Sequence, residues 1–298
     1  MLLPGSGILQ KPLKVACIQI ASGPSKAQNL AQARQKVLQA ATAGASLIVL
    51  PECFNSPYST AKFREYAEPL STPPDPIASP SFTALAQMAQ DTSTFIVGGS
   101  VPECDPSGKI YNTCAVYSPE GKLLASHRKM HLFDINIPNG MSFCESDTLA
   151  AGDNITVVDL EGYGRVGLGI CYDMRFAELS TIAARQGAFA LVFPSAFNTT
   201  TGPLHWELLG RARAVDNQVY TVLCSQSRGA GSSYPAWGYS MVSDPMGRIV
   251  AGTGEGEDIV YATLEPEVIE EARLAIPITV QRRHDVYPDI GQLVRTEW

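Results

Sequence analysis

Gly44-Ala-Ser-Leu-Ile-Val-Leu-Pro-Glu-Cys-Phe-Asn55 recurs later in the chain as Gly187-Ala-Phe-Ala-Leu-Val-Phe-Pro-Ser-Ala-Phe-Asn198. Each copy contains an apolar run that ends in proline. Each follows an earlier strand-like run, at residues 14–20 and 165–171, and a segment with helical spacing of apolar residues, at 25–43 and 175–186. We interpret the two stretches as an internal repeat of one β-α-β unit. The alternative is two unrelated buried strands that both end in proline.

The repeat predicts where chemistry takes place. A right-handed β-α-β crossover makes its two strands parallel and brings their carboxyl ends to one edge of the sheet, where ligands usually bind. Glu52 directly follows the second strand of the first copy, and Cys171 ends the first strand of the second copy. We therefore expect both residues at this edge.

The remaining segments extend the same α/β pattern. Hairpins are predicted at residues 111–127 and 239–251, and further elements are a helix at 205–215, strands at 218–224 and 258–264, and a helix at 267–275. No linker divides the chain. We expect one domain at residues 13–276, an N-terminal extension at 1–12 and a C-terminal arm at 277–298. The arm is either ordered against a partner subunit or disordered.

Composition excludes several classes of protein. The 298 residues include 22 Lys+Arg and 29 Asp+Glu, a net charge of −7, without a basic cluster, which argues against nucleic acid as a partner. No apolar run is long enough for a membrane helix, and residues 1–10 have neither the charge nor the apolar run typical of a secretory leader, so we do not expect secretion. Seven cysteines without a C-x-x-C pair and only four histidines favour a reducing compartment, without a disulfide framework or zinc site. We expect a cytoplasmic protein; a mitochondrial location stays open.

Cys171 is a candidate nucleophile. It lies between a buried strand and the start of the next helical segment. A helix N-terminus favours negative charge and lowers the pKa of a thiol. The alternative is a buried cysteine that serves only as a small hydrophobic residue.

A thiol nucleophile needs a base and a group that holds the oxyanion. Glu52 is the candidate base, because a carboxylate at the end of a buried strand is partly desolvated and its pKa rises. Lys129 follows a strand and could supply a fixed positive charge. The alternatives are that Glu52 is a solvated loop carboxylate and that Lys129 is an ordinary surface lysine. His205 begins a helix and is better read as a core or capping contact.

Three segments together resemble the signatures of the nitrilase superfamily of carbon–nitrogen hydrolases. They are residues 50–55, 127–134 and 169–176, in the superfamily's order, and the resemblance extends over residues 14–285. Residues 174–179, 197–209 and 211–220 are most similar to the omega-amidase group of the Nit branch and its fungal relatives.

This resemblance implies a four-layer α-β-β-α sandwich, built from two similar β-α-β halves. It also implies a Glu52–Lys129–Cys171 triad, an amide substrate and a thioester intermediate. Lys129 and the backbone N–H of Tyr172 would hold the oxyanion, and Glu145 would orient the lysine; an ordinary loop carboxylate is the alternative for Glu145. The superfamily needs no metal or organic cofactor. Its members typically form homodimers or larger homo-oligomers, in which C-terminal segments cross between subunits.

Omega-amidases act on short dicarboxylic monoamides such as 2-oxoglutaramate and 2-oxosuccinamate, so the pocket must bind a carboxylate. Arg175 is the candidate cation; a structural ion pair with Asp173 or Glu178 is the alternative. Further candidate substrate-binding residues are Asn198 and Thr199 in the pocket and Tyr58 at its entrance. Two other functions stay open: an amidase for deaminated glutathione and, more distantly, a non-catalytic interaction scaffold.

Overall fold

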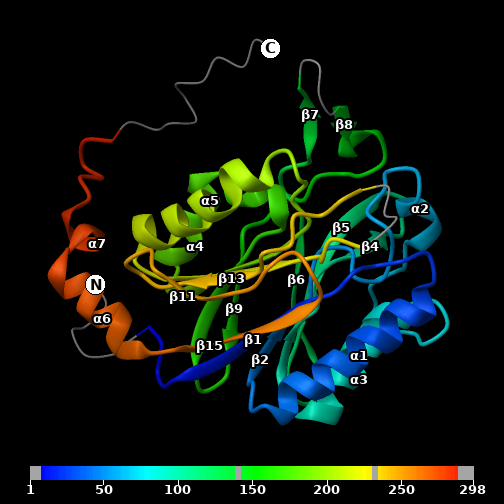
Figure 1. The fold of residues 1–298 in the computed structure, drawn as a ribbon, viewed down its shortest axis with the longest axis horizontal. Helices are drawn as coiled ribbons and strands as arrows, with labels where there is room; N and C mark the ends of the chain where they lie inside the picture. Colours follow the sequence, from blue (N-terminus) through cyan, green and yellow to red (C-terminus); the bar gives the residue numbers. More distant parts are fainter. Residues whose placement is uncertain (1–7, 138–141, 230–233, 288–298) are drawn as a thin grey trace.

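Two β-sheets lie face to face in the computed structural model, which describes residues 8–137, 142–229 and 234–287 (Figure 1). Helices α1 (Lys26–Thr42) and α3 (Pro80–Thr92) cover the outer face of the first sheet, and α4 (Ala177–Arg185) and α5 (Gly202–Asn217) cover the second. The layers thus follow the order α-β-β-α, and the predicted fold class is confirmed.

Each sheet mixes parallel and antiparallel strands. The first contains, in spatial order, β15 (Asp258–Leu264), β1 (Leu13–Gln19), β2 (Leu47–Val49), β3 (Phe95–Val97), β5 (Ile110–Tyr117) and β4 (Val101–Cys104), with β6 (Leu123–Arg128) paired to β5. The second contains β14 (Ile249–Gly252), β13 (Met241–Ser243), β12 (Tyr220–Ser225), β11 (Ala188–Ser195), β10 (Gly164–Leu168) and β9 (Thr156–Leu160). A small separate sheet joins β7 (Asp134–Asn136) to β8 (Ser142–Cys144).

The remaining helices of the described chain lie outside the two main helical layers. They are α2 (Phe63–Tyr66), α6 (Pro266–Ala275), α7 (Ile278–Gln281) and the 3₁₀ turns η1 (Glu145–Asp147) and η2 (Cys171–Arg175). α6 and α7 lie beyond one end of the sheets (Figure 1). Residues 1–7 and 288–298, within the predicted extension and arm, lie outside the described residues.

The two halves have the β-α-β arrangement that the repeat predicts. β1 pairs in parallel with β2, with Val15 opposite Leu47, and β10 pairs in parallel with β11, with Val166 opposite Ala190. The first crossover helix, α1, begins after Ser25, whose side chain accepts a hydrogen bond from the Gln28 N–H, as a helix cap does. Both crossovers therefore bring the carboxyl ends of their strands to one edge.

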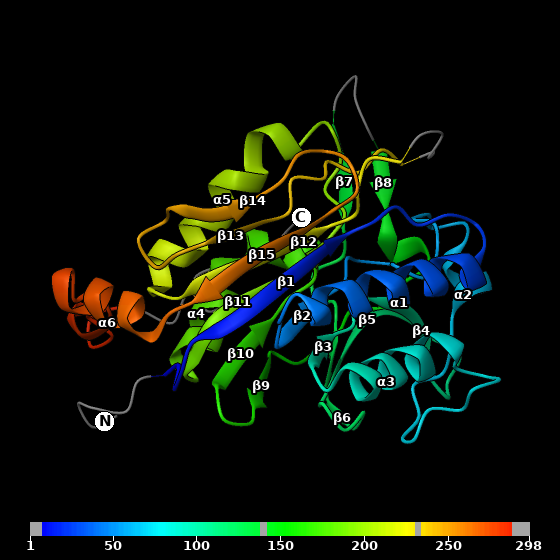
Figure 2. The ribbon, with the colours of Figure 1, turned by 60° about the horizontal axis from the view of Figure 1, so that its bottom comes forward.

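The main core lies between the two sheets, because the alternate residues of their central strands point inward. Val15 and Val49 from the first sheet and Val192 from the second belong to one cluster of buried side chains. A second cluster fills the space between the first sheet and helices α1 and α3. The last strand, β15, pairs antiparallel with β1 over its whole length (Figure 2). The last strand of the described chain is thereby hydrogen-bonded to the first.

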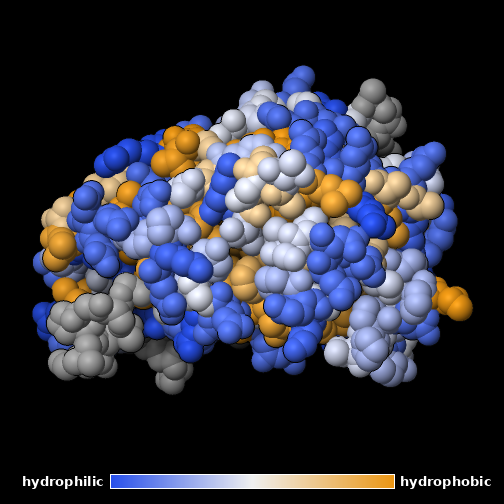
Figure 3. All heavy atoms as spheres, turned by 90° about the horizontal axis from the view of Figure 1, so that it is seen from below, coloured by the Kyte–Doolittle hydropathy of each residue, from blue (hydrophilic) through white to orange (hydrophobic). Residues whose placement is uncertain are grey.

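On the face shown in Figure 3, hydrophobic side chains form small separate patches among polar ones. Within the described residues, no helix combines the length and the apolar character that a membrane crossing needs.

Candidate active site

Cys171 sits at a sharp turn after β10. Its φ angle of 47° lies in the left-handed region, which is unfavourable for a residue with a Cβ and is concentrated at functional sites. Gly169, two residues earlier, lets the Phe193 ring pack against the backbone, since an added Cβ would lie 2.5 Å from that ring. The side chain of Cys171 is buried, at 5% exposure. The backbone is thus held in a strained conformation that presents one thiol at the carboxyl edge of the sheet.

The predicted lowering of the Cys171 pKa is wrong. Cys171 begins the 3₁₀ turn η2, and the longer helix α4 begins only at Ala177. Burial and the nearby Glu52 carboxylate instead raise the pKa of the Cys171 thiol well above its usual value, although Lys129 and the Ala196 N–H act in the opposite direction. The thiol therefore keeps its proton at neutral pH and needs a base to become a nucleophile.

Glu52 is fully buried beside this thiol. Its Oε1 accepts hydrogen bonds from Asn112 Nδ2 at 2.8 Å and from Lys129 Nζ at 3.0 Å. The carboxylate interacts with the Cys171 thiol, and each group shifts the pKa of the other. Burial raises the pKa of Glu52, as the sequence predicts, while Lys129 limits the rise. Oε2 makes no hydrogen bond of normal geometry to a described residue and is available to take up the thiol proton.

Lys129 follows β6 and is also fully buried. Its Nζ lies 3.0 Å from Glu52 Oε1 and 2.8 Å from Glu145 Oε2. Burial alone would favour the neutral amine, but the Glu145 and Glu52 carboxylates raise the pKa of Lys129 well above its usual value. The side chain is consequently a fixed cation inside the protein.

Glu145 begins η1 and connects several parts of the site. Its Oε1 accepts a hydrogen bond from the Tyr58 hydroxyl at 2.5 Å, and its Oε2 accepts one from the Phe133 N–H at 2.6 Å. The prediction that Tyr58 lines the entrance is wrong in its position. Tyr58 is only 4% exposed, stacks on Phe143 and lies within the buried cluster.

Arg175 ends η2, and its guanidinium lies over the rings of Tyr172 and Phe197, at 5.4 and 5.1 Å from their centroids. Nη1 is 3.0 Å from Nδ1 of His205, and the buried Nε has no partner among the described residues. The alternative of an ion pair with Asp173 or Glu178 is wrong, since Arg175 forms no ion pair within the described chain. His205 lies in α5 and contacts Arg175 rather than serving as a cap.

Asn198 and Thr199 follow β11. The Asn198 Oδ1 accepts hydrogen bonds from the N–H groups of Thr200 and Thr201, at 3.0 and 2.8 Å, and stabilises the turn before α5. The side chain of Thr199 is exposed. These contacts account for the local structure, and substrate binding by both residues stays a prediction.

Asp173 is a site residue that the motif reading did not assign. Its buried carboxylate accepts hydrogen bonds from the backbone N–H of Ile170 at 2.9 Å and of His131 at 2.9 Å. His131 Nδ1 and His127 Nε2 lie 2.7 and 3.1 Å from the same carboxylate. Although burial acts in the opposite direction, hydrogen bonds from His127 and His131 lower the pKa of Asp173 well below its usual range. Asp173 thereby joins the Cys171 turn to the segment that carries Lys129.

Two other supporting residues come from distant strands. Asn112 on β5 binds the Glu52 carboxylate, and Gln226 after β12 donates from Nε2 to the Glu52 carbonyl at 2.7 Å. Asp173 had a detectable signal, because it lies two residues after Cys171 while His127 and His131 lie two residues on either side of Lys129. Neither Asn112 nor Gln226 belongs to a motif that could have indicated its role.

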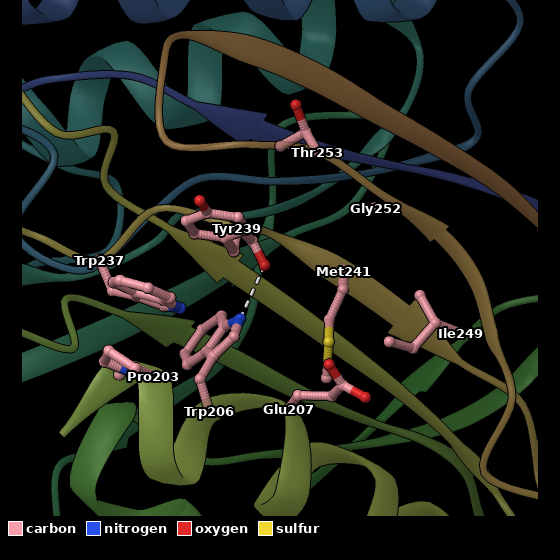
Figure 4. Close-up of a pocket in the computed structure, with 10 residues that line it drawn as sticks. Pro203, Trp206, Glu207, Trp237, Tyr239, Met241, Ile249, Gly252 and Thr253 are labelled. Carbon is pink, nitrogen blue, oxygen red and sulfur yellow. Dashed lines mark hydrogen bonds between the residues drawn. The ribbon is translucent and has the colours of Figure 1, made fainter. Parts of the chain in front are cut away.

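A separate pocket of about 320 Å³ lies between α5 and strands β13 and β14 (Figure 4). Trp206, Trp237 and Tyr239 form its aromatic side, and Trp206 Nε1 donates to the Tyr239 carbonyl at 2.7 Å. None of the predicted catalytic or substrate-binding residues lines it. Among the described residues, no group of three or more His, Cys, Asp or Glu side chains is arranged to hold a metal ion.

Comparison with known proteins identifies the family. Residues 14–274 match the carbon-nitrogen hydrolase family. The chain belongs to this family. The hydrolase is 53% identical over 293 residues to Omega-amidase NIT3 of Saccharomyces cerevisiae, with 97% of this chain and 99% of that protein covered. It is 49% identical over 274 residues to Omega-amidase NIT2 of Bos taurus, with 92% and 96% covered.

A relative whose structure has been solved has the same fold as this hydrolase. The crystal structure of Saccharomyces cerevisiae Nit3, a member of branch 10 of the nitrilase superfamily, superposes with a TM-score of 0.85 at 50% identity. The match covers 93% of this chain and 98% of that one. The predicted membership of the nitrilase superfamily is therefore confirmed.

Proposed function

We propose that this hydrolase is an omega-amidase that acts on short dicarboxylic monoamides such as 2-oxoglutaramate and 2-oxosuccinamate. One observation carries the chemistry: a buried thiol, Cys171, interacts with a buried carboxylate, Glu52, which is itself bound to a buried lysine. The substrate class is supported by the full-length similarity to omega-amidases of yeast and cattle.

The reaction begins with proton transfer. Glu52 removes the proton from Cys171, and the thiolate attacks the carbonyl carbon of the amide. The raised pKa of Glu52 makes it a stronger base than an ordinary glutamate, while the positive charge of Lys129 favours its ionised form. Activation of the Cys171 thiol therefore does not require a histidine base.

Lys129 and the backbone N–H of Tyr172 then hold the negative charge on the tetrahedral intermediate. Protonated Glu52 returns its proton to the amine as the C–N bond breaks, which releases ammonia and leaves a thioester on Cys171. Glu145 keeps Lys129 in place through contacts at 2.8 and 2.9 Å. The lysine therefore meets the intermediate without reorganisation.

Hydrolysis of the thioester completes the cycle. Glu52, again ionised, removes a proton from water, and the resulting hydroxide attacks the thioester carbonyl. The C–S bond breaks, the acid leaves, and Cys171 recovers the proton from Glu52. Each step moves one proton between the substrate, water, Glu52 and Cys171.

Arg175 is proposed to bind the substrate carboxylate. It offers a guanidinium whose buried Nε has no partner among the described residues and which no described carboxylate neutralises. We expect Arg175→Gln to raise KM for 2-oxoglutaramate by about 10- to 100-fold, because a charge-assisted hydrogen bond is lost. The matched control is an uncharged amide of similar size, whose KM should change little. Equal effects on both amides would contradict this role.

The decisive experiment is ammonia release from purified protein with 2-oxoglutaramate, deaminated glutathione and a simple nitrile. An omega-amidase gives the highest kcat/KM with 2-oxoglutaramate, and Cys171→Ala and Cys171→Ser remove this activity. A preference for deaminated glutathione would replace the proposed substrate while leaving the chemistry intact. Wild-type rates in both cysteine variants would refute the mechanism. Cytoplasmic location and a homodimeric state stay predictions.

A further inference from the structure

A cavity with several arginines lies far from the catalytic cluster. It is open to solvent on one side, has a volume of about 370 Å³ and is lined by residues of α4, α5, α6, α7 and the segment after α7. Its lining includes three guanidinium groups, those of Arg185, Arg273 and Arg282, and one carboxylate, that of Asp216. The cavity is therefore positively charged as a whole.

The position of the cavity separates it from catalysis. Arg185 ends α4, just before β11 begins at Ala188, whereas Ala196, whose N–H interacts with Cys171, directly follows the other end of β11. β11 contains 8 residues. A strand of that length spans roughly 25 Å at the usual rise per residue. A small molecule in the cavity cannot be the amide that reacts at Cys171.

Two of the three arginines have partners within the protein. Arg185 Nη1 contacts His284 Nε2, and Arg282 Nη2 donates to the backbone carbonyl of Asp216. Arg273 differs, because its Nε is buried and makes no hydrogen bond within the described residues. Burial lowers the pKa of Arg273, and no ion pair within the described residues offsets that effect. The Arg273 side chain as a whole is half-buried, and a partly desolvated cation is stabilised by an anionic partner.

Arg273 lies in the last turn of α6, so its charge interacts favourably with the end of that helix, but its hydrogen-bond donors are not used there. Cations near helix C-termini are stabilised by the helix dipole, and both α4 and α6 end near the cavity. However, Arg165 Nη1 already donates to the Gln186 carbonyl at the end of α4. Gln218 Nε2 likewise donates to the carbonyls of Ala272 and Ile276 at the end of α6. Arg273 makes no corresponding bond, so its guanidinium remains available.

We propose that this cavity is a binding site for a small dianion carrying phosphate or carboxylate groups. Three guanidinium groups face one carboxylate, and that carboxylate of Asp216 is also 3.4 Å from Arg213 Nη1 outside the lining. Two negative charges would balance the remaining arginines. The forked donors of arginine match the paired oxygens of phosphate and carboxylate, and the volume suits a small metabolite.

The dianion would join elements that are distant in sequence. Arg185 belongs to α4, Arg273 to α6 and Arg282 to the segment after α7. A ligand that contacts all three would hold the C-terminal segment against α4. Binding should therefore raise the melting temperature, since a ligand that binds only the folded state stabilises it.

The test measures melting temperature and calorimetric binding of the full chain with inorganic phosphate and with succinate. Sodium chloride at equal ionic strength is the reference. We expect a rise of about 5 °C at a ligand concentration near 100 times Kd for at least one of the two dianions. A response to phosphate identifies a phosphate compound, and a response to succinate identifies a dicarboxylate. No response to either beyond that of chloride would overturn the proposal.

Arg273→Gln is the key variant, and Arg283→Gln is its matched control, because Arg283 is exposed and pairs with Asp285. We expect Arg273→Gln to lose the dianion response by at least 10-fold in Kd while it keeps amidase activity. Without ligand it should melt close to wild type, because the buried Nε makes no hydrogen bond within the described residues. Arg283→Gln should respond as wild type does. An unchanged Kd in Arg273→Gln would refute the site, and Arg282→Gln gives a second test if the first variant folds poorly.

Discussion

The two β-α-β halves share a backbone plan but differ in the residues at their strand ends. Counted from the paired residues Val15 and Val166, Ile20 in the first half corresponds to Cys171 in the second. Counted from Leu47 and Ala190, Glu52 corresponds to Ser195. Ile20 is a fully buried apolar side chain, and Ser195 donates to the nearby carbonyl of Phe193.

This difference shows how the site is divided between the halves. Both crossovers bring a strand end to the interior, but one half contributes the base and the other contributes the nucleophile. The equivalent positions hold residues without acid–base chemistry. The fold therefore determines where the groups meet, and two side chains determine what they do.

The largest expected effect comes from the nucleophile. Cys171→Ala should lower kcat/KM by at least about 10⁴-fold, since no other group can form the thioester. Cys53→Ala is the matched control, because Cys53 is also buried with a positive φ of 50°. Its thiol accepts a hydrogen bond from Ser100, so we expect a loss of less than about 10-fold. Ammonia release and the mass of trapped thioester measure both. A thioester on Cys53 would contradict the conclusion that the second half contributes the nucleophile.

The second effect is the loss of the base. Glu52→Gln should lower kcat/KM by about 10³-fold, whereas Ser195→Ala at the equivalent position should change it by less than about 3-fold. Burial raises the pKa of Glu52 above 4.5, so wild-type kcat/KM should fall as the pH drops through a value above 4.5. The raised pKa of Cys171, above 9.0, predicts no loss on the alkaline side below pH 9. A wild-type acid limb that persists in Glu52→Gln would assign the base elsewhere.

Asp173 provides a smaller effect, through position rather than contact. Asp173→Asn should lower kcat by about 10- to 100-fold with little change in KM, because the Cys171 turn loses hydrogen bonds that anchor it. The variant should also lose about 2–4 kcal/mol of unfolding free energy at pH 7, as a charged acceptor is removed from buried donors. Steady-state kinetics and urea unfolding measure the two effects. Unchanged kcat together with lower stability would show a purely structural role.

The pH dependence of this stability has a definite sign. The pKa of Asp173 is lower in the folded protein than in the unfolded chain, so its contribution is present above the unfolded value near 3.8. The contribution is lost as the pH falls toward the folded value. The difference in unfolding free energy between wild type and Asp173→Asn should accordingly persist at pH 5 and narrow only in strongly acidic solution. A difference that vanishes already at pH 6 would contradict the lowered pKa.

Much of the fold could be predicted from the sequence because its information is local. Residues 258–264 were predicted as a strand and form β15, and the helix predicted at residues 25–43 is α1. The meeting of Glu52 and Cys171 followed from the repeat, since parallel strand ends share one edge. Lys129 needed the family resemblance, because nothing in its own segment shows that it is buried.

Other features depended on packing between distant segments. Asn112 lies on β5 and Gln226 directly follows β12, and both bind Glu52. Neither residue belongs to a sequence motif that includes Glu52, so no spacing rule indicates its role. The pKa of Cys171 had the wrong predicted sign because a 3₁₀ turn replaced the expected helix start, and because burial outweighed the nearby lysine. No sequence pattern indicates that Tyr58 lies inside an aromatic cluster rather than at the pocket entrance, because its ring partners come from distant segments.

The smallest effect compares the two asparagines that end the repeat. Asn198→Ala should cost about 1–2 kcal/mol of unfolding free energy, since Oδ1 accepts from two backbone N–H groups in the turn before α5. Asn55→Ala should cost less than about 1 kcal/mol. It removes one bond to Ser81 at 3.0 Å but also removes a buried Oδ1 that has no partner among the described residues. Urea unfolding of both variants at pH 7 measures the difference. A larger loss for Asn55→Ala would show that the first half depends on its asparagine more than these contacts indicate.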